Sequence, residues 1–187
     1  MLRAALRDFV DEDFVHSIAG RIIAEVTDYG EQEAGCLQAS LVQFDMALDH
    51  GIDTGRLGDG ISGDISEYWE RLFDVETGCL KEEIQSEYEV LSMDLLIIEH
   101  LELYPRFRGL GIGVSAVRRT IDVFGTGCGL VVCKPWPFQF TPTAAADQLA
   151  LKRLELPNIE EGVALQKLRK YVSHIWVSGH SPILEST

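Results

Sequence analysis

The segment Leu95–Asp122, LLIIEHLELYPRFRGLGIGVSAVRRTID, constrains the fold more than any other part of this 187-residue chain. It begins with a continuous apolar run, Leu95–Ile98, which is typical of a strand buried on both faces. Pro105 ends this strand, and three alternating glycines follow. From Gly113 the apolar residues are spaced three or four apart, and this spacing indicates a helix.

A second short apolar strand, GLVVCKPW at 129–136, comes after this helix. The order strand, glycine loop, helix, strand predicts a βαβ unit with a right-handed crossover and parallel strands. We therefore expect an α/β (α+β) fold, in which helices flank a mixed central sheet. The length of the chain suits one domain, spanning 1–187, and is short for two.

The other segments give weaker patterns. Residues 17–26 fit either a strand or a helical turn, because periodicity alone does not separate the two. Residues 35–51 carry mixed signals that favour a helix, and the glycine-rich stretch 51–64 indicates a loop. The remaining elements that we expect are a helix or arm over 1–15, helices from Ser66, over 79–91 and over 160–176, and one or two short strands in the last dozen residues.

The net charge of −14 excludes a uniformly basic surface for nucleic acid and argues against binding to anionic membranes. No apolar stretch reaches the roughly 18 residues of a membrane span, and the N-terminal segment lacks the apolar region of a signal peptide. The four cysteines, at positions 36, 79, 128 and 133, show no CxxC spacing. We therefore expect a cytoplasmic protein with reduced thiols and neither a zinc site nor a redox motif.

Positive charge gathers around the glycines although the chain is acidic. Between Leu103 and Ile121 four arginines occur without one Asp or Glu: Arg106, Arg108, Arg118 and Arg119. The start of a helix presents unpaired N–H groups, and glycines let an anion approach the backbone. This combination predicts a ligand that carries phosphate. A Walker A loop is absent, and Val114 stands where a dinucleotide fingerprint requires glycine or alanine.

The sequence RGLGIG resembles the acyl-CoA motif of the GNAT acetyltransferase superfamily, Q/R-x-x-G-x-G/A. The matching residues are Arg108, Gly111 and Gly113. The preceding YP, the following helix and strand, and the late helix ALQKLRKYVSHIW are also similar to the family pattern. The recognisable core covers about residues 95–177, whereas the N-terminal half has no match.

This resemblance implies a GNAT-like sheet and transfer of an acetyl group from acetyl-CoA to an amine, without a metal. The pantetheine would run along the strand from His100 to Tyr104, and the pyrophosphate would lie on the amides of Arg108–Val114. The implied cofactor-binding residues are Leu101, Leu103, Arg106, Arg108, Gly109, Leu110, Gly111, Ile112, Gly113 and Val114.

Direct attack of an amine on the thioester requires a general base, for which Glu99 and Glu102 are the candidates. Strict alternation puts them on opposite faces of the strand, so at most one faces the cleft unless a bulge intervenes. His100 fits either a proton relay or a packed histidine. Tyr171 is the candidate acid for the leaving thiolate, although it lies one residue before the position of the family tyrosine. The alternatives are a water molecule as the acid or no acid at all.

The resemblance leaves alternatives open. The acceptor is a small-molecule amine or a basic peptide, and a second copy of the chain would complete the sheet of a homodimer. A catalytically inactive acyl-CoA-binding module of the same fold is the main alternative. A protein that binds another phosphate ligand, such as ATP or NAD, is the second.

Overall fold

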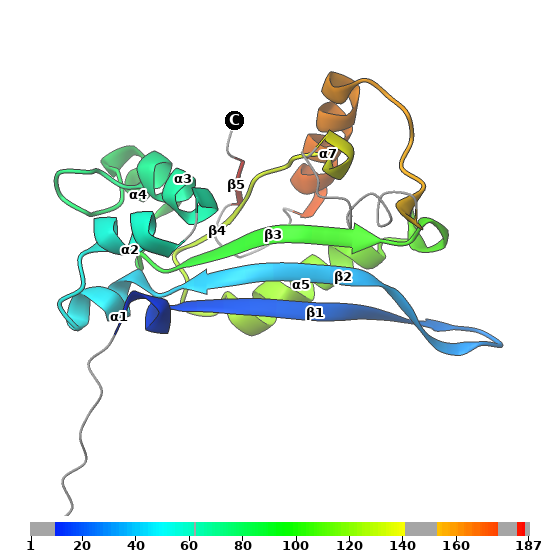
Figure 1. Cartoon of the computed structure of the whole chain (residues 1–187), viewed down its shortest axis with the longest axis horizontal. Coiled ribbons are helices and arrows are strands. Elements are labelled where there is room, and N and C mark those ends of the chain that lie inside the picture. The colour runs from blue at the N-terminus through cyan, green and yellow to red at the C-terminus, as the bar shows by residue number, and fades with distance from the viewer. Residues whose placement is uncertain (1–9, 62, 141–152, 176–182, 186–187) are drawn as a thin grey trace, which may run out of the picture.

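A five-stranded mixed sheet forms the centre of the molecule in the computed structural model, which describes residues 10–61, 63–140, 153–175 and 183–185 (Figure 1). The strands lie side by side in chain order: β1 (Val15–Val26), β2 (Gly30–Val42), β3 (Leu95–Leu103), β4 (Leu130–Cys133) and β5 (Ile183–Glu185). Strands β1 to β3 are antiparallel, whereas β4 and β5 run parallel to β3. The structure thus confirms a mixed α/β architecture.

Helices connect these strands. The helical elements are η1 (Asp11–Phe14), α1 (Phe44–Asp49), α2 (Thr54–Ile61), α3 (Gly63–Leu72), α4 (Glu82–Tyr88), η2 (Pro105–Phe107), α5 (Ile112–Phe124), η3 (Phe138–Phe140) and α7 (Glu161–Ile175). In Figure 1, α1 to α4 gather at the end where β3 begins, α5 lies along the opposite face of the sheet, and α7 stands near the end of β3. In the described ranges, none of the helices has the length and apolarity that a membrane span requires.

The two faces of β3 are buried in two separate cores. Leu95 and Ile97 pack with Phe44 and Phe73 in the core under α1 to α4. Leu96 and Ile98 pack with Val117 of α5 and its neighbours in the other core. Burial on both faces explains why this strand has a continuous apolar run rather than an alternating one.

The predicted βαβ unit is confirmed. β3, α5 and β4 follow one another, and β4 pairs in parallel with β3 from Leu95↔Leu130 to Ile98↔Cys133. α5 buries Val117 and Ile121, which lie one turn apart on the face toward the sheet. The late helix is also present as α7 up to Ile175, and its last predicted residue lies outside the described ranges.

The expected helix over 35–51 is wrong in its first half. Gly30–Val42 forms β2, and only Phe44–Asp49 is helical. Both signals in the sequence were real but belonged to consecutive elements: alternation holds up to Val42 and the helical spacing starts at Phe44. For 17–26 the strand alternative is correct, because these residues lie in β1.

The expected loop over 51–64 is also wrong, because Thr54–Ile61 forms α2. The reason is helix packing: a Cβ atom at Gly58 would lie 2.5 Å from the ring of Trp69 on α3.

α3 begins at Gly63, so Ser66 is not its N-cap. In the 79–91 segment α4 ends at Tyr88, and Leu91 is fully exposed rather than part of an apolar face. The arm expected over 1–15 is described from residue 10, where Asp11–Phe14 forms η1 and Val15 begins β1.

Candidate functional site

β3 separates from β4 halfway along its length. β4 pairs only with Leu95–Ile98, whereas β2 stays paired with β3 as far as Leu103. The second half of β3, Glu99–Leu103, therefore has one edge outside the β3–β4 ladder. Backbone N–H and C=O groups on such an edge are suited to hydrogen-bond an extended ligand.

The glycine loop lies where the free half of β3 ends, and it leads into α5. Gly109 and Gly111 have φ values of 72° and 78°, a left-handed conformation that favours glycine. A Cβ atom at either position would meet nothing within 4 Å, so the backbone there is open to approach. Gly111 is also the N-cap of α5 and has no side-chain capping bond. The first N–H groups of α5 thus form an open anion-binding geometry.

The other predicted cofactor-binding residues surround this loop. Leu110 is exposed, Arg106 is exposed and lies over the ring of Phe107, and Val114 and Leu101 pack on the α5-side core. Ile112 is the first residue of α5. Arg108 has a different setting: its Nε donates to the carbonyl of Leu103 (2.9 Å) and its Nη2 to that of Leu154 (2.6 Å). These two bonds tie the loop to the end of β3.

A β-bulge at Glu99 decides which way the polar side chains of β3 point. Gln38 of β2 pairs with His100 and Ala39 pairs with Ile98, so Glu99 is the extra residue. After the bulge, Leu101 packs on the same core as Ile98, three residues earlier. Glu102 therefore lies on the face away from α5. Strict alternation without the bulge would have placed it on the other face, under α5.

Both candidate carboxylates consequently lie on one face of the sheet. Glu99 is exposed and accepts a hydrogen bond from Ser40 (2.7 Å), whose register partner Ile97 packs in the core under α1 to α4. Glu102 pairs in register with Cys36, which alternation on β2 puts on the same face as Ser40. The sequence allowed a bulge as one of two possibilities, and the structure contains it.

Glu102 is the most enclosed of these groups, with its side chain only 7% exposed. Its Oε1 accepts a charge-assisted hydrogen bond from Arg153, and its Oε2 lies 3.6 Å from Nε2 of His100. Arg153 also lies over the ring of Tyr104, 4.9 Å from its centroid. Burial raises the pKa of the nearby Cys36 thiol, and the negative charge of Glu102 raises this pKa further.

Tyr171 lies on the other side of β3, away from these carboxylates. A Cβ atom at Gly113 would overlap its hydroxyl, and Leu101 and Leu103 reach the same point. The ring packs against the core on the α5 side, and burial raises the pKa of its phenol. Tyr171 is therefore next to the first turn of α5.

Sequence patterns did not point to Cys36, Ser40 or Arg153, although Ser40 and Arg153 bind the glutamates of β3 and Cys36 pairs in register with Glu102. Cys36 and Ser40 reach them only through the register between β2 and β3, and Arg153 comes from 51 residues beyond Glu102. No local spacing carries such information.

Comparison of the chain with models of known protein families, with curated proteins and with solved structures gave no match.

Proposed function

We propose that this protein is a GNAT-like N-acyltransferase that transfers an acetyl group from acetyl-CoA to an amine. The observation that carries the proposal is the position of the glycine loop at the end of the half of β3 that does not pair with β4. An open strand edge suits the amide groups of pantetheine, and the first turn of α5 suits its pyrophosphate. A CoA thioester carries both groups, the amides of pantetheine and the pyrophosphate. Their separation is about the length of the second half of β3.

The geometry favours Glu99 over Glu102 as the general base. Glu102 is enclosed and already paired with Arg153, whereas Glu99 is exposed at the bulge where β3 leaves β4. In the proposed step the amine nitrogen bonds to the thioester carbon, its proton passes to Glu99, and the C–S bond breaks. Tyr171, a phenol that is protonated at neutral pH, then donates a proton to the CoA thiolate.

One observation favours the catalytically inactive acyl-CoA-binding module. Tyr171 and the two carboxylates lie on opposite faces of β3, so acid and base meet only at its free edge. A binding module needs the loop and the edge alone. Turnover separates the two functions, because free thiol release from acetyl-CoA across a panel of amines requires the chemistry as well as the binding site.

The binding experiment compares CoA with 3′-dephospho-CoA, ATP and NAD by isothermal titration calorimetry. We expect CoA to bind more tightly than ATP or NAD. Arg106→Gln should weaken CoA binding about two- to fivefold, the scale of one exposed ionic contact. Arg119→Gln is the matched control, because it removes the same charge from an exposed position about two turns after the start of α5. Gly111 is unsuitable as a probe, since any side chain at its φ of 78° strains the backbone itself.

A second comparison tests the chemistry. Glu99→Gln should leave CoA affinity unchanged and lower the rate of thiol release by about 100-fold or more, the contribution of a general base. CoA binding without thiol release from any amine would establish the binding module instead. Binding of ATP or NAD but not CoA would refute both.

A further inference from the structure

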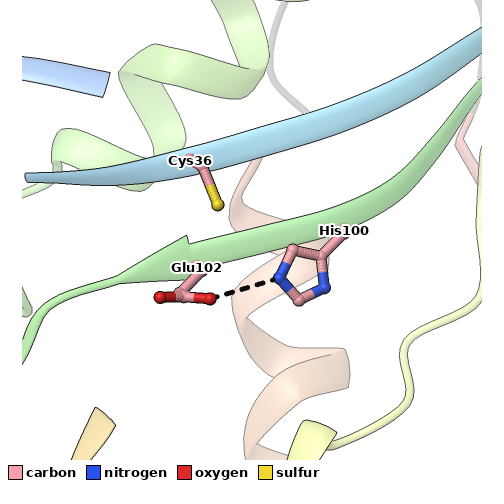
Figure 2. Close-up of side chains that lie close together, drawn as sticks. All are labelled: Cys36, His100 and Glu102. Atoms are coloured by element: carbon pink, nitrogen blue, oxygen red, sulfur yellow. Dashed lines mark ion pairs between the residues drawn. The ribbon is translucent and has the colours of Figure 1, made fainter. Parts of the chain in front are cut away.

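Three side chains with different metal-binding atoms converge on the face of the sheet away from α5. They are Cys36 of β2 and His100 and Glu102 of β3, shown in Figure 2. One ligand atom from each, the thiol sulfur, an imidazole nitrogen and a carboxylate oxygen, lies within 4.8 Å of the other two. Glu102 is buried, and the other two are half-buried. The proposed acyl transfer does not use these three side chains, although His100 and Glu102 lie on the half of β3 whose edge would bind pantetheine.

The sheet itself builds this cluster. His100 and Glu102 are two apart on β3 and so share a face, and Cys36 is the register partner of Glu102 on β2. The bulge at Glu99 is essential, because without it His100 and Glu102 would follow Ile98 into the core under α5. A strand pair gives the three donors a rigid support, which favours a preorganised ligand site over a chance surface grouping.

The distance between His100 and Glu102 suits two ligands of one metal ion better than a hydrogen bond between them. Oε2 of Glu102 lies 3.6 Å from Nε2 of His100, which is too long for a good hydrogen bond. Two ligands bound at 2.0–2.2 Å around a tetrahedral zinc ion lie about 3.3–3.6 Å apart. In Figure 2 the imidazole nitrogen that faces Glu102 is also the one on the side of Cys36. A nucleophilic relay instead uses the two opposite ring nitrogens.

Arg153 does not bind the carboxylate oxygen of Glu102 that faces His100. It binds Oε1 of Glu102, while Oε2 is the oxygen that faces His100. A carboxylate that gives one oxygen to a metal commonly gives the other to an outer hydrogen-bond donor, which fixes its orientation. Arg153 thus fixes the orientation of Glu102 through the oxygen that does not face His100.

We propose that Cys36, His100 and Glu102 bind a zinc ion, or a divalent transition metal of similar preference, with a fourth position left for water. One thiolate, one imidazole and one carboxylate form a mixed set of the donors that zinc takes in proteins. Three protein ligands rather than four are typical of zinc sites with an open position.

The test is titration of the chelator-treated, full-length protein with Co²⁺, which takes zinc sites and reports thiolate ligation by a near-ultraviolet charge-transfer band. We expect this band to saturate at one Co²⁺ per chain and to disappear when Zn²⁺ is added. Cys36→Ser should abolish the band and weaken Zn²⁺ binding by more than about 100-fold, beyond the loss of an outer-shell partner. Cys79→Ser is the control, because Cys79 is an exposed thiol outside the cluster.

His100→Gln against His50→Gln repeats the comparison for the imidazole, since His50 is exposed on another part of the surface and outside the cluster. Circular dichroism shows that each variant is folded before titration. Glu102→Gln is left out, because it also breaks the buried pair with Arg153. No charge-transfer band at millimolar Co²⁺, or a band that persists in folded Cys36→Ser, would overturn the proposal.

Discussion

Gly111 and Gly113 lie two residues apart, and each position requires glycine for a different physical reason. Gly111 is glycine because its backbone is left-handed, and the space around it is open. Gly113 has an ordinary helical conformation but no room, because the hydroxyl of Tyr171 and the side chains of Leu101 and Leu103 close over it. The sequence motif shows both glycines alike, and only their surroundings distinguish approach to a ligand from close packing.

Gly113→Ala should therefore lower the free energy of unfolding by about 1–3 kcal/mol, as overpacking in a core does. Adding Tyr171→Phe should recover part of the loss, because it removes the hydroxyl that the new methyl group meets. Gly162→Ala is the matched control: Gly162 is also the second residue of its helix, and a Cβ atom there meets nothing within 4 Å. The control should be neutral or slightly stabilising. Urea midpoints at constant m-value measure all three. Equal destabilisation of the two single glycine variants would contradict the packing argument.

For Arg108, too, the role that the motif implies differs from the contacts that the residue makes in the structure. The resemblance implies that this residue binds the cofactor, yet two of its N–H groups donate to the carbonyls of Leu103 and Leu154. These bonds fix the loop relative to the end of β3. Its direct contact with phosphate stays a prediction, and the exposed Arg106 is the better probe of charge at the loop.

At the scale of elements, the bulge and the separation of β3 from β4 define the site. The bulge turns Glu102 away from α5, and the separation leaves Glu99–Leu103 with one edge outside the ladder to β4. Neither feature follows from the apolar pattern of the strand. Both depend on which backbone groups of β2 and β4 are within reach, and strand pairing is non-local.

Hydrogen exchange tests this division of β3. Amides of Leu95–Ile98 should exchange slowly because strands on both sides pair with them, whereas the alternate amides of Glu99–Leu103 that point away from β2 should exchange faster. Saturating CoA should slow the exchange of these alternate amides and of the first turn of α5. Amides of β1 provide the internal control, because that strand lies at the far edge of the sheet. CoA binding without any protection on Glu99–Leu103 would place the pantetheine elsewhere.

At the scale of the whole molecule, acidic residues dominate. The chain has 30 Asp and Glu against 16 Lys and Arg, which gives a net charge of −14. Charge of one sign repels itself in the folded state, and salt screens this repulsion beyond a Debye length of about 10 Å at 0.1 M. The local ion pairs, such as Arg153 with Glu102, are much less affected because one partner is buried.

The temperature of unfolding should therefore rise by a few degrees between about 10 mM and 150 mM salt, the range in which screening becomes effective. Differential scanning calorimetry with NaCl and with KCl measures the effect, and the two salts should agree because screening depends on ionic strength alone. A transition temperature that stays constant or falls would show that repulsion between the acidic groups does not limit stability.

The sequence alone determined the β3–α5–β4 unit, because apolar period, proline and glycine act within one continuous segment. It also determined the place of the glycine loop between strand and helix, since left-handed backbone and helix starts are local properties. Only the tertiary structure decided that α2 is a helix, because its glycines serve contact with Trp69 rather than a loop. The same holds for the cluster of Cys36, His100 and Glu102, which depends on strand register and on one bulge. The bulge adds one residue to β3 and moves every following side chain to the other face, and it arises from pairing with β2, a strand far away in the chain.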